Sequence, residues 1–446
     1  MRHSLEWSHA FAGRVSPAAM EQLQSGYPTL ARHFASEIQS GRLPCLSLPF
    51  RADLEQQITA LLPALNRFKH MLVLGIGGSA LGARALQKAF FPGQDRPGHK
   101  GPWLWIADNV DADSLDAYFT ELPPEQTVVV PISKSGGTIE TLAQYFLARQ
   151  WLQTSLGSGW NEHMVVITDE TKGFLREEAA RNAFASLPVP DYLGGRYSAL
   201  SAVGLLPAAF LGMDWKELLA GAWDVTRRLA ENPDAVEKHP ALSLAAWNIA
   251  LANAGYSQLI FFSYIPLWAT FGPWFCQLWA ESLGKEGRGT MPISAVGVTD
   301  QHSVNQMFLD GPRDKGCLFL TCDGLSRGRP FPDELPGQWS WLKGKRFGEL
   351  LDAEALGTSM ALAHSNTPLI RIHMADSSER AAGALMALLE ATTLLAGWMM
   401  GINPIDQPAV ELGKRLANAR LGAPGYAAEE TALGHFLSVP SWKEEF

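Results

Sequence analysis

Two short stretches rich in glycine and hydroxyl side chains carry groups that could bind an anion. The first runs from Gly75 to Gly82 and the second from Ser133 to Thr141, and each follows an apolar segment. Each apolar segment predicts a strand, and the residues after each stretch predict a helix. A loop of this kind exposes backbone N–H groups at the positive end of a helix dipole, where a phosphate is stabilised. Two such loops in one domain indicate a phosphorylated small molecule as the ligand.

Neither loop has the usual pattern of a nucleotide site. The dinucleotide fingerprint requires a glycine where this chain has Ala80, and the Gly-Lys-Ser/Thr ending of a nucleoside-triphosphate loop is absent. Two simpler interpretations stay open for the loops taken singly. The first could be only a tight strand-to-helix turn, and the second only a hydroxyl-rich helix cap.

Glu281 is a candidate general base. It is the first charged residue after the forty uncharged positions 241–280, and the residues around it predict a helix that ends at Gly284. Gln277 lies four residues earlier and therefore on the same helical face. The alternative is a structural carboxylate neutralised by Lys285 at the end of the helix.

Three further side chains could assist proton transfer or stabilise an anion. His302 follows a predicted strand and is expected at a helix N-terminus, either as a proton shuttle or as a capping residue. Arg196 follows two glycines in a turn and could stabilise an anion or form a structural salt bridge. Lys414 could form an ordinary helical pair with Glu411.

The elements that must position these residues follow an alternating pattern. Nine short apolar segments predict strands: 71–74, 103–107, 127–132, 164–168, 185–189, 258–264, 292–298, 316–322 and 368–374. Helical segments lie between them, and the strands lack a two-residue alternation, so parallel sheets covered on both faces are expected. We expect a mostly helical segment at 1–48, a first α/β domain at 49–211, a helical connection at 212–240, a second α/β domain at 241–420 and an irregular tail at 421–446.

Composition excludes several other classes of protein. The net charge of −9, with dispersed Lys and Arg, disfavours nucleic-acid binding. The uncharged stretch 241–280 is interrupted by Pro266 and by Gly272-Pro273, so we expect a buried helix, strand and helix there and no membrane span. Four cysteines that lie far apart or inside apolar runs predict free thiols in a reducing cytoplasm. No His/Cys/Asp/Glu spacing is typical of a metal site, and no cofactor is expected.

Six motifs in this order resemble the glucose-6-phosphate isomerase (phosphoglucose isomerase) family. They are GIGGSALG at 75–82, SKSGGTIET at 133–141, GGRYS at 194–198, QLWAESLGK at 277–285, DQHS at 300–303 and QPAVELGK at 407–414. The resemblance spans about residues 70–415. It implies two sugar-isomerase (SIS) domains and interconversion of glucose 6-phosphate and fructose 6-phosphate through a cis-enediol.

The resemblance also implies a role for each matching residue. Glu281 would be the base that moves a proton between C2 and C1, and Arg196 would steady the enediol. His302 and Lys414 would assist ring opening. The implied substrate contacts are Gly78, Ser79, Ser133, Lys134, Ser135, Thr138, Glu140, Gln277 and Gln407. In the last motif Pro408 and Ala409 replace the Trp-Gly pair common in relatives, which puts the contacts around Gln407 in question.

Family members are typically homodimers, so the resemblance implies a homodimer in which His302 is shared across the interface. Two other functions stay open. One is an isomerase that also acts on mannose 6-phosphate, and the other is a non-catalytic SIS-domain sensor of sugar phosphates. The joint presence of Glu281, His302, Arg196 and Lys414 argues against a sensor, which needs only the phosphate loops.

Overall fold

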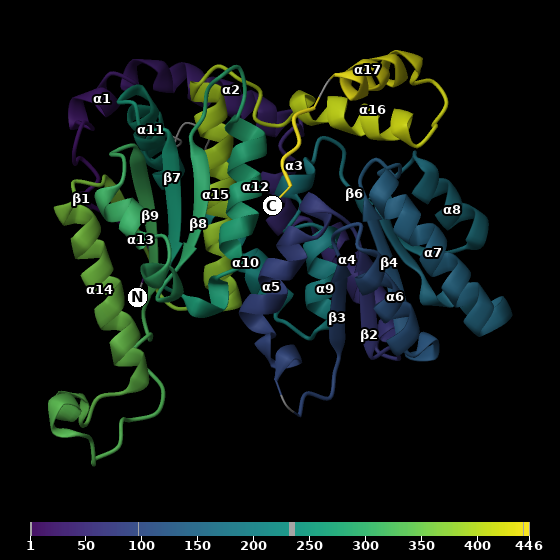
Figure 1. Cartoon of the computed structure of the whole chain (residues 1–446), viewed down its shortest axis with the longest axis horizontal. Helices are drawn as coiled ribbons and strands as arrows, with labels where there is room; N and C mark the ends of the chain where they lie inside the picture. Colours follow the sequence, from purple (N-terminus) through teal and green to yellow (C-terminus); the bar gives the residue numbers. More distant parts are fainter. Residues whose placement is uncertain (1, 97, 232–236, 440, 446) are drawn as a thin grey trace. The chain divides into compact units, whose positions relative to one another are not determined.

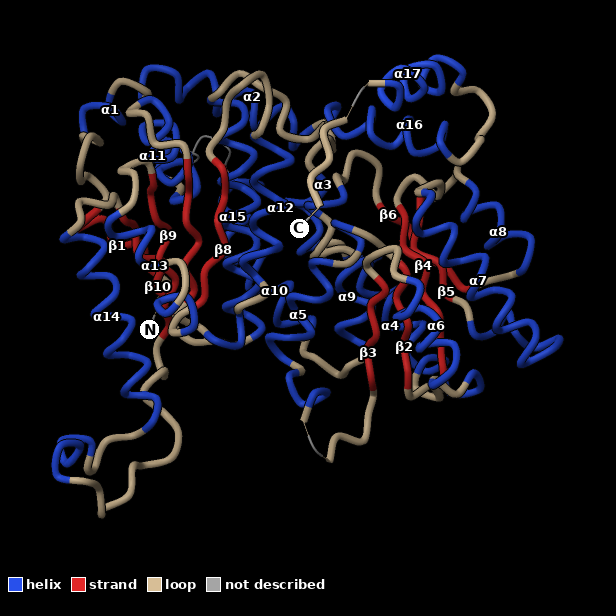
Figure 2. Tube along the Cα trace, viewed as in Figure 1, coloured by secondary structure: helices blue, strands red, loops and turns tan. Residues whose placement is uncertain are grey.

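The computed structural model describes residues 2–96, 98–231, 237–439 and 441–445. Its chain contacts divide it into two compact units, Met1–Pro404 and Ile405–Phe446. The larger unit contains two five-stranded sheets, which Figure 2 shows in red. Helices α5, α10, α12 and α15 lie between these two sheets in Figure 1.

The first sheet is entirely parallel and has the strand order β3-β2-β4-β5-β6. Its strands are β2 (His70–Leu74), β3 (Trp103–Ala107), β4 (Thr127–Ser133), β5 (Val165–Asp169) and β6 (Ala185–Val189). Every residue of β4 and β5 is buried, as expected for strands covered on both faces. The accompanying helices are α4 (Ala52–Leu65), α5 (Leu81–Phe90), α6 (Ala112–Glu121), α7 (Ile139–Leu156), α8 (Phe174–Asn182) and α9 (Ala202–Phe210).

The second sheet has the order β1-β10-β9-β7-β8 and is parallel except at one edge. Its strands are β1 (Ser4–His9), β7 (Gln258–Ser263), β8 (Met291–Val296), β9 (Lys315–Cys322) and β10 (Leu369–Met374). Its accompanying helices are α10 (Trp215–Glu231), α11 (Pro240–Asn253), α12 (Phe271–Leu283), α13 (Asn305–Asp310), α14 (Phe347–His364) and α15 (Glu379–Met399). Edge strand β1 pairs antiparallel with β10, so the expectation of wholly parallel sheets is corrected at this edge.

The remaining helices lie near the chain ends. They are α1 (Pro17–Glu21), α2 (Tyr27–Gln39) and α3 (Pro44–Ser47) in the larger unit, and α16 (Glu411–Arg420) and α17 (Ala427–Ser438) in the smaller one. The expected irregular tail after residue 421 is wrong, because α17 occupies twelve of its residues. Residues 232–236 of the expected helical connection lie outside the described residues.

The nine predicted strands are present, with ends shifted by at most two residues. The uncharged stretch 241–280 forms α11, β7 and α12, as expected, and most of it is buried. Helix α15 is long and apolar enough to cross a membrane by length and composition alone, but 83% of that stretch is buried inside the protein. It packs against α10, α11 and α12 and is therefore a core helix.

The N-terminus of α11 contains a buried histidine whose ionisation affects stability. His239 Nδ1 accepts a hydrogen bond from the Ala241 amide, and Nε2 donates to the Val225 carbonyl, so a neutral ring satisfies both contacts. Burial lowers the pKa of His239 to about 4. In the unfolded chain the ring takes up its proton near pH 6.5. The stability that the neutral ring contributes is therefore complete above pH 6.5 and is lost as the pH falls to about 4.

We expect this single group to reduce the free energy of unfolding by up to about 3 kcal/mol between pH 6.5 and 4. His239→Asn is the matched variant, because asparagine can cap the helix and does not titrate. Urea unfolding at several pH values should give a shallower acid loss in the variant. Identical pH dependence in the two proteins would contradict the assignment.

Candidate functional site

The two glycine-rich loops lie next to each other at one edge of the first sheet. The first follows β2 and the second follows β4, and these strands are parallel neighbours, with Leu74 opposite Pro131. Strand β3 lies on the other side of β2, so the chain order reverses between β2 and β4. Ligands of open α/β sheets bind at the carboxyl ends of the strands at such a point.

The second loop presents hydroxyl groups that its own helix does not use. Ser133 Oγ lies 2.9 Å from Thr138 Oγ1 and 3.5 Å from Ser135 Oγ. Thr138 occupies the N-cap position of α7, but its side chain makes no capping hydrogen bond. The interpretation of this loop as a side-chain helix cap is therefore wrong. Lys134 lies between Ser133 and Ser135 in the sequence. Its side chain is half-buried, and this burial lowers the pKa of its amine.

The first loop closely approaches two other segments. A Cβ atom on Gly78 would lie 2.2 Å from the Gly195 carbonyl carbon, and one on Gly77 would lie 2.9 Å from Gln277 Nε2. Gly77 also has a φ of +57°, which favours glycine. The loop is thus more than a tight turn. Its bare backbone brings the Arg196 turn and the Glu281 helix to Gly78 and half-buried Ser79.

Glu281, Gln277 and Arg196 form one hydrogen-bonded cluster. Gln277 Nε2 donates to Glu281 Oε1 at 2.9 Å, and Arg196 Nη1 lies 3.3 Å from Glu281 Oε2. The Arg196 side chain is fully buried, whereas the Glu281 side chain is one-third exposed. Gln277 Oε1 is buried and has no hydrogen-bond partner in the described part of the chain. Glu281 is thus held from two sides.

Glu281 has a different partner from the one considered from sequence. Its carboxylate pairs with Arg196, while Lys285 Nζ donates to the Asn403 carbonyl. The alternative that Lys285 neutralises Glu281 is therefore wrong. The pair places a carboxylate and a guanidinium side by side, which suits removal of a proton and stabilisation of the charge that results.

His302 is not at a helix N-terminus, contrary to expectation. It is the last residue of a 3-10 turn, Thr299–His302, and α13 begins three residues later with Val304 at its N-cap. The ring is exposed and, within the described part of the chain, has no hydrogen-bond partner. His302 therefore neither caps a helix nor joins the Glu281 cluster of its own chain.

Three other sequence candidates are placed differently. Glu140 lies in the first turn of α7, directly after the hydroxyl loop. Gln407 and Lys414 belong to the smaller compact unit. Lys414 Nζ lies 2.7 Å from Glu411 Oε1, which is the helical pair anticipated from the spacing.

Sequence reasoning missed two residues that contact the cluster. Arg196 Nε donates to Ser282 Oγ at 2.6 Å, and the Tyr197 hydroxyl lies 3.0 Å from the same oxygen. Both residues are within the quoted motifs, but the bonds join positions 85 and 86 residues apart. Only their adjacency to Arg196 and Glu281 could have drawn attention to them.

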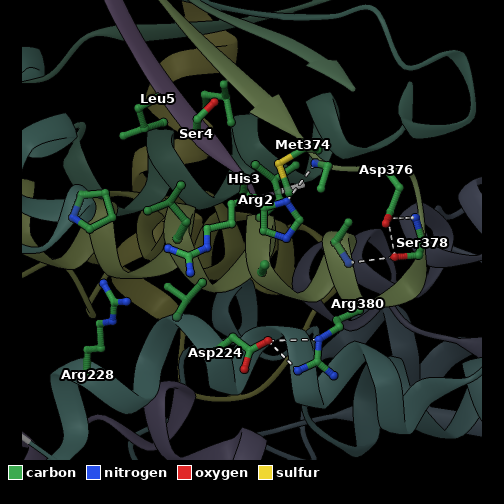
Figure 3. Close-up of a pocket in the computed structure, with 18 of the residues that line it drawn as sticks. Arg2, His3, Ser4, Leu5, Asp224, Arg228, Met374, Asp376, Ser378 and Arg380 are labelled. Carbon is green, nitrogen blue, oxygen red and sulfur yellow. Dashed lines mark hydrogen bonds and ion pairs between the residues drawn. The ribbon is translucent and has the colours of Figure 1, made fainter. Parts of the chain in front are cut away.

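A cavity of about 500 Å³ is separate from this cluster (Figure 3). It lies at the carboxyl end of β10 and is lined by β1, α10, α15 and the start of α11. Arg380 at its wall is paired with Asp224 at 2.6 Å. None of the candidate catalytic residues lines this cavity, so the reactive groups belong to the loop edge of the first sheet.

The two flanked sheets, the paired glycine- and hydroxyl-rich loops and the carboxylate–guanidinium cluster define the sugar-isomerase class of α/β proteins. The sequence profile described as phosphoglucose isomerase matches residues 63–322 and 352–432. The chain belongs to the phosphoglucose isomerase family.

Individual relatives agree with this assignment. The chain is 39% identical over 439 residues to a glucose-6-phosphate isomerase of Rubrobacter xylanophilus, covering 96% of this chain and 98% of the relative. A solved structure of a hypothetical protein from Thermus thermophilus has a TM-score of 0.83 and 32% identity, covering 94% of this chain and 99% of its own. A glucose-6-phosphate isomerase structure from Chlamydia trachomatis shares the fold, with a TM-score of 0.79 at 23% identity, covering 98% of this chain and 92% of its own.

Proposed function

We propose that this chain interconverts glucose 6-phosphate and fructose 6-phosphate by moving a proton between C2 and C1 of the open-chain sugar. The observation that carries the proposal is the cluster of Glu281, Arg196 and Gln277, packed against the first phosphate loop. Family membership and the name of the Rubrobacter relative support the same reaction.

The phosphate would bind at the junction of the two loops. Ser133, Ser135 and Thr138 offer hydroxyl donors, and Lys134 offers a nearby positive charge. Helix α7 has 18 residues and begins at this loop, so its N-terminal dipole also favours the dianion. Gly78 and Ser79 would contact the sugar phosphate from the first loop, and Glu140 from the start of α7.

The isomerisation itself would use Glu281 as the base. Its carboxylate removes the C2 proton of the aldose, the C2–H electrons form a C1=C2 double bond, and the carbonyl oxygen gains negative charge. Buried Arg196 lies beside the carboxylate and would stabilise this enediol intermediate. The proton of the C2 hydroxyl passes to the C1 oxygen, and the protonated Glu281 returns its proton to C1 as the C2 oxygen becomes a carbonyl. The two proton transfers balance, so the step consumes no cofactor.

Ring opening would need groups that the cluster does not supply. We assign it to His302 and Lys414, with Gln407 as a further sugar contact, by their match to the family motifs. His302 is exposed, and Val304 and Met307, which follow it in the chain, are 40% and 57% exposed. Apolar exposure beside His302 in the sequence supports a homodimer in which His302 completes the site of the partner chain. The free cysteines support a cytoplasmic location.

A coupled assay tests the proposed function. Purified protein is supplied with fructose 6-phosphate, and glucose 6-phosphate is detected as it forms. We expect turnover in the presence of a chelator. A parallel assay with mannose 6-phosphate tests the wider specificity. This sugar is the C2 epimer of glucose 6-phosphate, so loss of its C2 proton gives the same enediol. Absence of turnover with both aldose and ketose phosphates would contradict the proposal and favour a sensor.

The hydroxyl loop should account for much of the phosphate affinity. Ser135→Ala combined with Thr138→Ala removes two donors to a dianion, and we expect about 10–100-fold weaker binding of 6-phosphogluconate by calorimetry. The matched control is Ser365→Ala with Thr367→Ala, because those two hydroxyls also bond each other, at 3.1 Å, outside the loops. Equal affinity in the loop variant and the control would place the phosphate elsewhere.

A further inference from the structure

The guanidinium of Arg196 is fixed by bonds that do not involve Glu281. Nε donates to Ser282 Oγ at 2.6 Å, and Nη2 donates to the Pro404 carbonyl at 2.6 Å. The contact from Nη1 to Glu281 is longer, at 3.3 Å. The side chain is fully buried, so these bonds form in a low-dielectric environment where each is strong. The bonds to Ser282 and Pro404 therefore orient Arg196 independently of Glu281.

Tyr197 closes these contacts into a ring. Its hydroxyl lies 3.0 Å from Ser282 Oγ and 3.4 Å from the Pro404 carbonyl, and the residue is 1% exposed. One arrangement of protons gives every donor an acceptor. Arg196 Nε donates to Ser282, Ser282 donates to Tyr197, Tyr197 donates to Pro404, and Arg196 Nη2 donates to the same carbonyl. If Tyr197 instead donated to Ser282, the serine proton would need another acceptor.

The phenol keeps its proton throughout the working pH range. Burial raises the pKa of Tyr197, since a phenolate could not be solvated there. The hydroxyl therefore stays available as a hydrogen-bond donor to the Pro404 carbonyl.

We propose that Ser282 and Tyr197 are positioning residues that hold Arg196 in place while Glu281 gains and loses its proton. This inference rests on the proposed function. When Glu281 takes the C2 proton, its charge disappears, and an arginine held only by that carboxylate would be free to turn away. The ring keeps the guanidinium beside the reacting atoms at the moment when negative charge has moved to the enediol. Ser282 and Tyr197 thereby allow Arg196 to stabilise the enediol.

The test compares Ser282→Ala and Tyr197→Phe with wild type and with Tyr264→Phe. Tyr264 is the matched control, because it is fully buried and its hydroxyl also bonds a side-chain hydroxyl, that of Thr358 at 2.7 Å, outside the cluster. We expect kcat to fall by about 10–100-fold in Ser282→Ala and by about 10-fold in Tyr197→Phe, with KM changed by less than about threefold. Ser282→Thr keeps the hydroxyl and should restore most of the rate.

The split between kcat and KM distinguishes positioning from simple stability. A displaced Arg196 stabilises the enediol less, so kcat should fall in Ser282→Ala and Tyr197→Phe with KM nearly unchanged, and should stay at the wild-type value in Tyr264→Phe. An unchanged kcat with a lowered Tm in the two variants would reduce these contacts to a structural role and overturn the proposal. If Ser282→Ala fails to fold, Tyr197→Phe and Ser282→Thr still decide it. Inactive wild-type protein would instead contradict the proposed function.

Discussion

Glu281→Gln is expected to lower kcat of sugar-phosphate isomerisation by about 10²–10⁴-fold, the usual contribution of a general base, and to leave the protein folded. The amide has the shape of the carboxylate, and its oxygen can still accept from Gln277. It has no basic site for the C2 proton. The variant should therefore bind 6-phosphogluconate with near wild-type affinity, because the loops proposed to bind the phosphate are untouched. The measurements are steady-state kinetics and calorimetry.

Glu37→Gln is a suitable control for that experiment. Glu37 is also paired with an arginine, Arg42, with Nε to Oε2 at 2.9 Å, but it lies on α2 and outside the cluster. We expect wild-type kcat from it. If Glu281→Gln turned over near the wild-type rate, or lost stability while retaining activity, Glu281 would be a structural carboxylate and another base would have to be found.

Mixed dimers should regain activity that neither parent has. His302→Ala and Glu281→Gln are each expected to be nearly inactive as homodimers, since each lacks one group of every site. In a heterodimer of the two, one site receives intact Glu281 from the first chain and intact His302 from the second. The other site carries both lesions. A pure heterodimer should therefore reach at most about half of wild-type activity, following the general additivity of independent sites.

The experiment requires co-refolding of differently tagged chains, isolation of the heterodimer and a rate measurement per dimer. Each parent refolded alone under the same conditions is the control. Heterodimers that show no gain over the parents would mean that each site is built within one chain. His302 would then act from its own chain or have no catalytic role.

Much of the fold could be predicted from local sequence. Short apolar segments without alternation, such as 127–132 and 164–168, indicate buried parallel strands because both faces of such strands meet helices. Strand β1 could not be recognised this way. It pairs with β10, which lies near the other end of the larger unit in the sequence, with Ser4 opposite His373. No local pattern specifies a partner so distant in sequence. Helix α17 could not be recognised for a different reason. Its apolar residues do not gather on one helical face, and it follows a turn that contains Gly422 and Gly425.

The candidate site could be predicted in part. The four-residue spacing of Gln277 and Glu281 on one helix is confirmed by their hydrogen bond. The partner of Glu281 could not be found by spacing, because Arg196 is 85 residues away in the sequence. The turn that carries Arg196 packs closely against Gly78, and such a contact between distant segments has no local signal. The prediction that His302 lies at a helix N-terminus was wrong, because the helix begins only after a 3-10 turn that contains His302.

The central claim is that this chain isomerises glucose 6-phosphate and fructose 6-phosphate through an enediol, with Glu281 carrying the proton. Incubation of fructose 6-phosphate with the protein in D₂O, followed by NMR, tests it most directly. The account predicts glucose 6-phosphate in which part of the product carries deuterium at C2, because a proton held by a partly exposed carboxylate exchanges with solvent. Glu281→Gln should form both product and label about 10²–10⁴-fold more slowly. Glucose 6-phosphate formed at full rate with no deuterium at C2 would indicate direct hydride transfer and would contradict the account.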